Sequence, residues 1–403
     1  MKLLSIYIFL ILLRPSDLKA QDTIPRPGVF DEGYFFIGPG DVLKFKSYVQ
    51  FDGYFPSHSS PGFSEFLIRR ARFAATGFFR QQFRYMLYAR YDKGKVELNE
   101  AFIEARHLSF ARLRVGQFKV PFSLSNLKSS SQLDLVSRSF VVENFSPNYD
   151  MGVMVFGEDK TKYINYALGI FNGTGLNKKE SNNSKTIIGR LVISPFAPSK
   201  NYILKQLYIG GSVAFGKQEK DISNATYKLP TEIPVFAFND SMRPEGNISV
   251  YALDLEWLVK SFSLKGEYLH YKAEHLVRNS MLSNFFASGF YVTATFIITG
   301  EVKTRSENVI PNRSFDPKKR KWGAFELAGR YEQATLSSTA LLLNLAEGLN
   351  GLKAVTCGIN WYVNDDIKFV INYSKHLFNK NIMLDNKYYR NSNTVLVRLQ
   401  YQF

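Results

Sequence analysis

Residues 67–77, LIRRARFAATG, place three arginines, Arg69, Arg70 and Arg72, within one short stretch. The guanidinium group presents a planar fork of donors that can bind two oxygens of an oxyanion at once. The acid closest to them in the sequence is Glu65. The residue types therefore indicate binding of small anions, and phosphate is the anion that arginine suits best.

The stretch around these arginines reads as a β-strand, because apolar and polar residues alternate with a period of two. The alternation recurs along the chain and is clearest in the last segment, TVLVRLQYQF, where Val397 and Arg398 fall on opposite faces. In a water-soluble sandwich the apolar face would form the core. In an outer-membrane barrel it would face lipid, and the polar face would line a wet lumen.

Segments of this kind predict an all-β, transmembrane antiparallel barrel of about 16 strands in residues 41–403, with an aqueous channel inside. Most segments have close to the roughly 10 residues that a tilted spanning strand needs. Long links alternate with short turns, and the long links at 172–185, 217–247, 271–286 and 379–392 are expected to face outward. The predicted strands are 41–55, 66–79, 80–92, 96–107, 111–121, 150–157, 162–171, 186–195, 204–216, 248–258, 261–271, 287–300, 322–334, 352–364, 367–378 and 393–403.

The link at 301–321 is an exception, because it is long but falls on the side of the short turns. Either the strand count is wrong by one here, or this long basic turn occupies a particular position in the fold. Its basic residues are Lys303, Arg305, Arg313, Lys318, Lys319, Arg320 and Lys321.

Residues 1–20 have a basic start, an apolar core and a small residue, Ala20, at the end, which predicts a signal peptide cleaved after that residue. Residues 21–40 are then an N-terminal periplasmic segment. No later stretch is apolar enough for a spanning helix, although 45% of the chain is hydrophobic. The net charge of +16 favours anionic partners: lipid headgroups, nucleic acid or small anions. Five scattered histidines and a single cysteine form no catalytic or metal-binding motif, so neither an enzyme nor a cofactor is expected.

The alternation along the strands predicts that Arg70 and Arg72 point toward the lumen, together with many other basic residues. Rings or ladders of such residues line anion pores. Alternatively, these cations pair with inward carboxylates and only stiffen the wall. The other basic residues expected to face inward are Lys44, Lys46, Arg84, Arg90, Arg114, Arg190 and Lys265, and the carboxylates include Glu100, Glu104, Asp254, Glu256, Glu267 and Glu326.

Several segments, read together, resemble the phosphate-selective porin O and P family. They are spread over nearly the whole chain beyond residue 20: FLIRRARFAATG (66–77), LNEAFIEA (98–105), VGQFKVPFSLSNLKSSS (115–131), NYDMGVMVFG (148–157), YALGIFNGTGLN (166–177), GFYVTATFIITGE (289–301), GAFELAGRYE (323–332) and INWYVN (359–364). The resemblance implies a 16-stranded porin, usually a homotrimer, with loops folded into the lumen. It also implies an arginine ladder that leads to a constriction for phosphate or polyphosphate.

The resemblance also assigns residues to this constriction. The family's paired arginines fall on Arg69 and Arg70. At Asn99, before Glu100, the chain departs from the Asp of phosphate-specific members, which puts phosphate selectivity in question. The family's constriction loop and inward-folding turn make candidates of Lys128, Ser129, Ser130, Ser131, Lys303, Arg305, Lys318 and Lys319.

The expected function is passive diffusion of anions, most of all phosphate or polyphosphate, across a bacterial outer membrane. The expected partners are inorganic anions, outer-membrane lipid and two further copies of the chain, and not nucleic acid. Two alternatives remain open: a general porin for sugars or neutral solutes, and a barrel that serves as a scaffold subunit of an envelope complex without significant conductance.

Overall fold

The computed structural model describes residues 30–31, 34–38, 41–92, 94–180, 182–217, 225–240, 242–278, 281–305 and 308–402. The predicted signal peptide lies outside these residues. Of the predicted periplasmic segment, the structure describes the backbone of two short strands, β1 (Phe30–Asp31) and β2 (Tyr34–Gly38). The second strand pairs with the start of the barrel.

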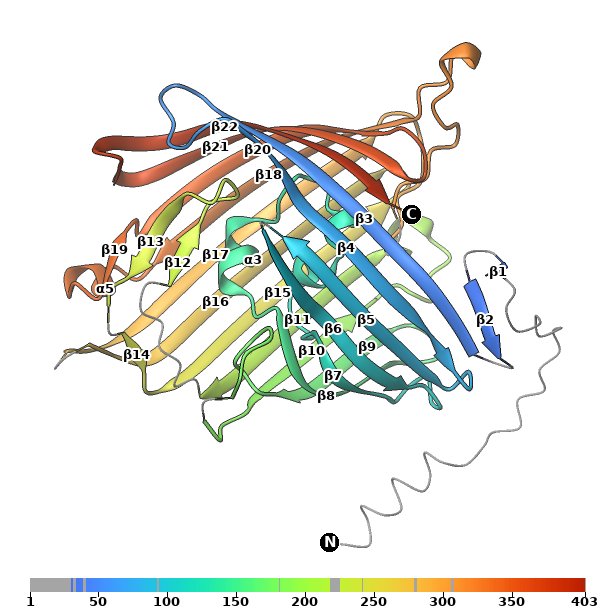
Figure 1. Ribbon diagram of the computed structural model, residues 1–403, viewed down its shortest axis with the longest axis horizontal. Coiled ribbons are helices and arrows are strands. Elements are labelled where there is room, and N and C mark those ends of the chain that lie inside the picture. Colours follow the sequence, from blue (N-terminus) through green and yellow to red (C-terminus); the bar gives the residue numbers. More distant parts are fainter. Residues whose placement is uncertain are drawn as a thin grey trace, which may run out of the picture.

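Sixteen antiparallel strands form a closed barrel, as the sequence predicted (Figure 1). The first of them pairs with the last along Tyr48–Pro56 and Thr394–Gln402, which closes the sheet. The barrel strands are β3 (Asp41–Pro56), β4 (Glu65–Phe79), β5 (Phe83–Asp92), β6 (Lys95–Ala105), β7 (Arg112–Lys119), β8 (Tyr149–Glu158), β9 (Ile164–Phe171), β10 (Thr186–Ile193), β11 (Leu207–Lys217), β15 (Asn247–Val259), β16 (Phe262–Arg278), β17 (Met281–Ile297), β18 (Ala324–Leu336), β20 (Gly351–Tyr362), β21 (Ile367–Leu384) and β22 (Lys387–Gln402).

The apolar face of each strand points out of the barrel and the polar face points in. Leu253 leaves 66% of its surface exposed on the outside, whereas its neighbour Asp254 leaves only 7% exposed on the inside. On β22, Arg398 and Gln400 are buried inside while Val395 faces outward. The alternation therefore corresponds to a barrel with an apolar exterior and not to a sandwich with an apolar core. No helix in the described part of the chain is long and apolar enough to cross a membrane.

Two of the links expected to face outward are largely strand. Residues 271–286 belong mostly to β16 and β17, and residues 379–392 belong mostly to β21 and β22. The chain reverses between the latter pair at Asp385 and Asn386, whose φ angles of 49° and 60° are typical of a two-residue hairpin turn. The polar residues of both hairpins hid their alternation, so the predicted strands ended too early.

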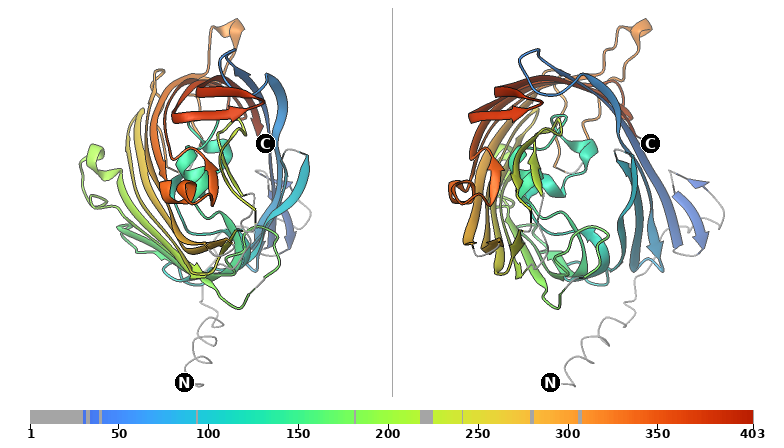
Figure 2. Two further views of the ribbon diagram at one scale, coloured as in Figure 1. Left: turned by 90° about the vertical axis from the view of Figure 1, so that its left-hand side faces the viewer. Right: turned by 60° about the vertical axis from the view of Figure 1, so that its left-hand side comes forward.

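The long link at 120–148 folds into the barrel and crosses its interior (Figure 2). It contains α2 (Leu124–Leu127), the 3-10 turn η1 (Ser130–Gln132) and α3 (Phe140–Phe145). We call this segment the inner loop. We call the two ends of the barrel the short-turn end, which has the turns 80–82, 159–163, 260–261 and 363–366, and the loop end, which is opposite.

A small sheet covers part of the interior at the loop end. It consists of β12 (Thr226–Lys228), β13 (Pro234–Phe238) and β19 (Ala346–Gly348), with α5 (Ser338–Leu342) beside it. Its aromatic side chains pack against Phe145 of α3 and Phe285 of β17 in the main hydrophobic cluster. This packing holds the small sheet and the inner loop together. The remaining short elements are α4 (Tyr202–Lys205), β14 (Arg243–Pro244) and the 3-10 turn η2 (Pro317–Lys319).

Candidate functional site

All three arginines of the opening motif are buried in the barrel wall facing the interior, with 6–8% of their surface exposed. Strict alternation would turn Arg69 outward. The pairing of β3 with β4, however, passes from Gln50 opposite Arg70 to Phe51 opposite Ile68, which leaves Arg69 as the extra residue of a β-bulge. Such bulges re-aim a side chain. The sequence alone gives no signal for it.

Arg69 and Arg70 share one carboxylate, Asp92 at the end of β5. Arg69 Nη1 lies 2.6 Å from Asp92 Oδ1, and Arg70 Nε lies 3.7 Å from Asp92 Oδ2. Arg70 also donates to the Oε1 of Gln50 at 3.3 Å. The acid comes from a neighbouring strand, so inspection of the nearby sequence could not find it. Arg69 also lies 3.9 Å from Glu232, and Arg90 lies 3.5 Å from the same Asp92, so the two arginines belong to a larger network of ion pairs.

Arg72 has no carboxylate within ion-pair distance among the described residues. Its Nη2 donates to Ser130 Oγ of the inner loop at 3.1 Å. Its guanidinium lies over the rings of Tyr48 and Tyr88, 5.1 and 5.4 Å from their centroids. Cation–π contacts of this kind hold a guanidinium in place without neutralising its charge.

Lys119 is a second cation in this region, and the sequence reasoning missed it. It ends β7, directly before the inner loop, and its Nζ donates to the backbone carbonyl oxygens of Asn126 and Lys128 at 2.6 and 2.9 Å. Its ammonium also lies 5.8 Å from the ring centroid of Tyr149. Carbonyl oxygens stabilise the ammonium but carry no net charge, and no carboxylate lies within ion-pair distance of it among the described residues. Its place at a strand end before a long loop was the one available signal.

Two cavities meet at these cations. A cavity of about 470 Å³ opens toward the loop end, and one of about 530 Å³ opens toward the short-turn end. Arg72, Lys119 and Tyr149 line both, so they form the junction between the two. The cavity at the loop end has nine basic residues against four acids: Arg69, Arg70, Arg72, Arg90, Lys95, Lys119, Arg138, Lys228 and Arg398 against Asp92, Glu97, Glu143 and Glu232.

The predicted serines and several predicted lumen residues border these cavities. Ser130 lines the cavity at the loop end, which also includes Arg90. The cavity at the short-turn end is lined by the predicted residues Lys44, Lys46, Glu100, Ser129 and Ser131.

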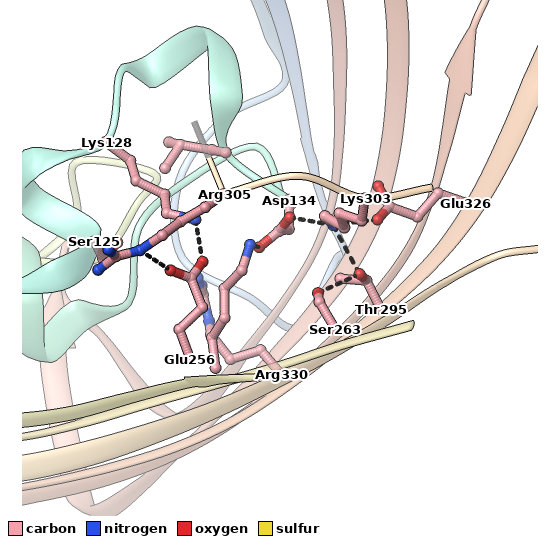
Figure 3. A network of polar contacts seen from close by, with 12 residues as sticks. Ser125, Lys128, Asp134, Glu256, Ser263, Thr295, Lys303, Arg305, Glu326 and Arg330 are labelled. Atoms are coloured by element: carbon pink, nitrogen blue, oxygen red, sulfur yellow. Dashed lines mark hydrogen bonds and ion pairs between the residues drawn. The ribbon is translucent and has the colours of Figure 1, made fainter. Parts of the chain in front are cut away.

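Lys128, Lys303 and Arg305 are paired with carboxylates of the opposite wall or of the inner loop (Figure 3). Lys128 Nζ lies 2.5 Å from Glu256 Oε1, and Arg305 Nε lies 3.0 Å from Glu256 Oε2. Lys303 pairs with Glu326 of β18 and, at 2.6 Å, with Asp134 of the inner loop. These ion pairs tie all three to the barrel wall or the inner loop, and Lys128 and Arg305 also line a third cavity, of about 390 Å³, together with Lys119.

Other predicted residues do not line either of the two cavities or are paired with an acid. Lys318 and Lys319 are exposed in η2, and neither is among the residues that line the two cavities. Arg84 and Arg114 share Glu104, in agreement with the alternative that inward arginines pair with inward acids. Asn99 is fully buried as the extra residue of a second bulge, on β6 opposite β5.

The inner loop is bonded to the wall on the far side of the cavities. Glu267 accepts hydrogen bonds from Ser123, Leu124 and Ser125, and Lys265 lies 2.7 Å from Asp134. Burial alone would raise the pKa of Asp134, but the ammonium groups of Lys265 and Lys303 hold it well below its usual value. Further bonds reach the loop from Arg330, Glu332, Asn360, Lys368, Asn372, Gln400 and Gln50.

Comparison with solved structures places the fold among porins. OmpT of Vibrio cholerae superposes with a TM-score of 0.58 at 8% identity, over 91% of this chain and 99% of that one. The outer membrane channel DcaP of Acinetobacter baumannii gives 0.56 at 7% identity, over 94% and 100%. An anion-selective porin from Comamonas acidovorans gives 0.55 at 9% identity, over 90% and 100%. At these identities the likeness concerns the fold alone.

Sequence comparison is more specific. Porin O of Pseudomonas aeruginosa strain PAO1 is 26% identical over 198 residues, which are 48% of this chain and 43% of the relative. The match thus spans less than half the length of that curated relative. The family model described as phosphate-selective porin O and P matches residues 46–403, which include every barrel strand in whole or in part. By this match, the chain belongs to the phosphate-selective porin O and P family.

Proposed function

We propose that the protein is a passive outer-membrane channel that prefers anions and that its selective constriction is the junction formed by Arg72, Lys119 and Tyr149. The observation that carries the proposal is the meeting of two cavities at two cations that have no carboxylate partner among the described residues. An anion that enters either cavity must pass these charges to reach the other.

The chemistry of the junction suits an oxyanion. Two atoms there, Arg72 Nε and the hydroxyl of Tyr149, are buried without a hydrogen-bond partner among the described residues. Both can donate to the oxygens of phosphate and replace part of its hydration shell. The shared carboxylate of Asp92 lowers the net charge next to the junction, which favours release after binding. Inorganic phosphate or polyphosphate is therefore the proposed substrate, and its passage needs no cofactor or energy source.

The proposal includes assembly as a homotrimer. Its support is the family membership and the trimer form solved for OmpT of Vibrio cholerae, which has a TM-score of 0.57 with this chain.

The decisive experiment is single-channel recording in planar bilayers. The reversal potential in a chloride gradient measures anion preference, and titration with phosphate measures block of the chloride current. We expect anion preference with block by phosphate, and weaker block in Arg72→Gln and Arg70→Ala. Lys46→Gln is the matched control, because Lys46 lines the cavity at the short-turn end but lies away from the junction; its block should be nearly unchanged.

The other outcomes separate the alternatives. Anion preference without block would indicate a general anion channel and contradict the phosphate site. Similar permeability to anions and cations would indicate a general porin for neutral solutes. Folded trimers that pass no current would favour a scaffold role.

A further inference from the structure

The link between β17 and β18 consists of two parts, one inside the barrel and one outside it. Lys303 and Arg305 turn into the barrel, where carboxylates hold them. Residues 313–322, which we call the basic turn, go the other way. In both views of Figure 2 the orange segment that contains them projects outside the ring of strands, beyond the barrel wall.

The basic turn is an ordered, strongly cationic structure. It contains Arg313, the run 318–321 (KKRK) and a single acid, Asp316, so that five of its residues are basic. The backbones of Asp316 and Lys321 exchange two hydrogen bonds of 3.0 Å, and the carboxylate of Asp316 accepts from the backbone of the two lysines that follow Pro317. All the basic side chains are exposed except that of Lys321, which is half-buried. The fold thus presents this charge outward and keeps its shape.

An aromatic stack fixes the basic turn to the outer face of the barrel. Trp361 of β20 stacks on Phe325 of β18 and Phe369 of β21, with ring centroids 5.9 and 5.5 Å apart. Phe315 of the basic turn meets the same indole edge-on at 5.4 Å. The Nε1 of Trp361 donates to the carbonyl of Trp322 at 2.7 Å. Aromatic residues of this kind form belts at the level of lipid headgroups in membrane barrels.

A second turn of the short-turn end repeats this arrangement and helps to locate the membrane surface. The turn that carries α4 is tied to the barrel by Trp257, whose Nε1 donates to the carbonyl of Ile203 at 2.8 Å. Tyr202, Ile203 and Leu204 of this turn are all exposed. Three consecutive apolar residues exposed on a turn suit contact with lipid better than contact with water. In each of these two turns of the short-turn end, a backbone carbonyl therefore accepts a hydrogen bond from an indole of the barrel.

We propose that the basic turn, residues 313–322, is a docking surface for the anionic phospholipid headgroups of the leaflet at the short-turn end. The aromatic stack sets the turn at the headgroup level, and its ammonium and guanidinium groups bind lipid phosphates. Clusters of basic residues beside a membrane attract anionic lipid in this way. The docking requires only that the barrel sit in a membrane, so it does not depend on which solute passes through the lumen.

Quenching of tryptophan fluorescence by brominated lipid tests this proposal on the full-length protein. The chain has three tryptophans, and Trp257→Phe leaves Trp322 and Trp361, both at the basic turn. This variant is reconstituted in phosphatidylcholine vesicles that contain phosphatidylglycerol, with bromine on either lipid at the same mole fraction. We expect brominated phosphatidylglycerol to quench severalfold more than brominated phosphatidylcholine.

Charge substitutions then assign the preference to the basic turn. The quadruple variant Lys318→Gln, Lys319→Gln, Arg320→Gln and Lys321→Gln should quench equally with both lipids. The matched control, Lys160→Gln with Lys162→Gln, changes exposed lysines of another turn at the same end and should keep the preference. Heat-modifiable migration in gels and an unchanged conductance verify that each variant is folded. Equal quenching by both lipids without the quadruple change, no quenching by either, or a preference that survives it would overturn the proposal.

Discussion

The ammonium group of Lys119 donates to the carbonyl oxygen of Lys128 at 2.9 Å, so one lysine positions the loop that carries the other. The ammonium groups of the two lysines differ in the groups that they contact. The side chain of Lys128 continues to Glu256, which neutralises it, whereas Lys119 is held by carbonyl oxygens and borders both cavities. The lysine next to the serines in the sequence is therefore held in an ion pair, and we propose that the lysine at the strand end supplies positive charge to the channel.

Lys119→Gln should lower anion preference, because it removes from the junction a cation that has no carboxylate within ion-pair distance among the described residues, while leaving a donor for the loop carbonyls. The reversal potential in a chloride gradient should move toward zero, and phosphate block should weaken severalfold. Lys128→Gln is the matched control, since its charge is already paired with Glu256, and Arg305 still pairs with Glu256 after the substitution; its block should be nearly unchanged. Equal effects of the two substitutions would contradict this division of roles.

Asp92→Asn should strengthen phosphate binding. The change removes the single carboxylate that Arg69 and Arg70 share, so both guanidinium groups gain attraction for an anion. We expect block at severalfold lower phosphate concentration and longer blocked intervals in single-channel records. Glu97→Gln is a useful comparison, because Glu97 lines the same cavity and, like Asp92, pairs with Arg90, but it has no ion pair with Arg69 or Arg70 among the described residues. Weaker block in Asp92→Asn would show that the carboxylate orients the arginines more than it competes with the anion.

Asp134→Asn should loosen the inner loop, because it leaves the buried ammonium groups of Lys265 and Lys303 without this carboxylate. Removing one partner of a buried ion pair destabilises by roughly 3 kcal/mol. We expect noisier open-channel currents and a lower temperature for the heat-induced gel shift. Asp365→Asn, in an exposed turn, should change neither. A quiet channel in Asp134→Asn would mean that the backbone bonds alone hold the loop.

The same carboxylate predicts a pH dependence. The folded-state pKa of Asp134 is held well below its usual value, which is about 3.9 in unfolded chains. Its stabilising contribution is therefore fully present above that value and is lost as the pH falls below it. Open-channel noise should stay constant from neutral pH to about pH 4 and rise at lower pH. In Asp134→Asn the noise should already be high at neutral pH and should change little on acidification.

The barrel could be predicted from the sequence because its signal is local and repeated. Alternation with a period of two gave the number of strands and their inward faces, including those of Arg70 and Arg72. The alternation did not give the ends of β21 and β22 at their hairpin, because polar residues occur there on both faces of the strands. Pairing between strands was not visible either. The bulge at Arg69 and the approach of Asp92 both depend on register, which no single segment encodes.

The positions of the candidate site residues were harder to predict because they depend on the course of two long links. The serines of the inner loop do border the cavities, but whether a basic side chain meets an anion or a carboxylate depends on which wall its segment faces. Lys128 and Lys303 face the wall rich in acids, and Lys319 leaves the barrel altogether. No spacing within these segments carries that information.

The attachment of the inner loop divides the barrel between two tasks. Carboxylate, amide and basic side chains of strands between β15 and β22 form hydrogen bonds and ion pairs with the inner loop. Most residues that line the two cavities come from β3–β8, on the other side of the barrel, and from the inner loop. The cavities are therefore off-centre in the barrel, and most of the residues that line them belong to the first 150 or so residues of the chain. Substitutions that change the substrate can accumulate among these residues during evolution, while the later strands continue to hold the inner loop in place.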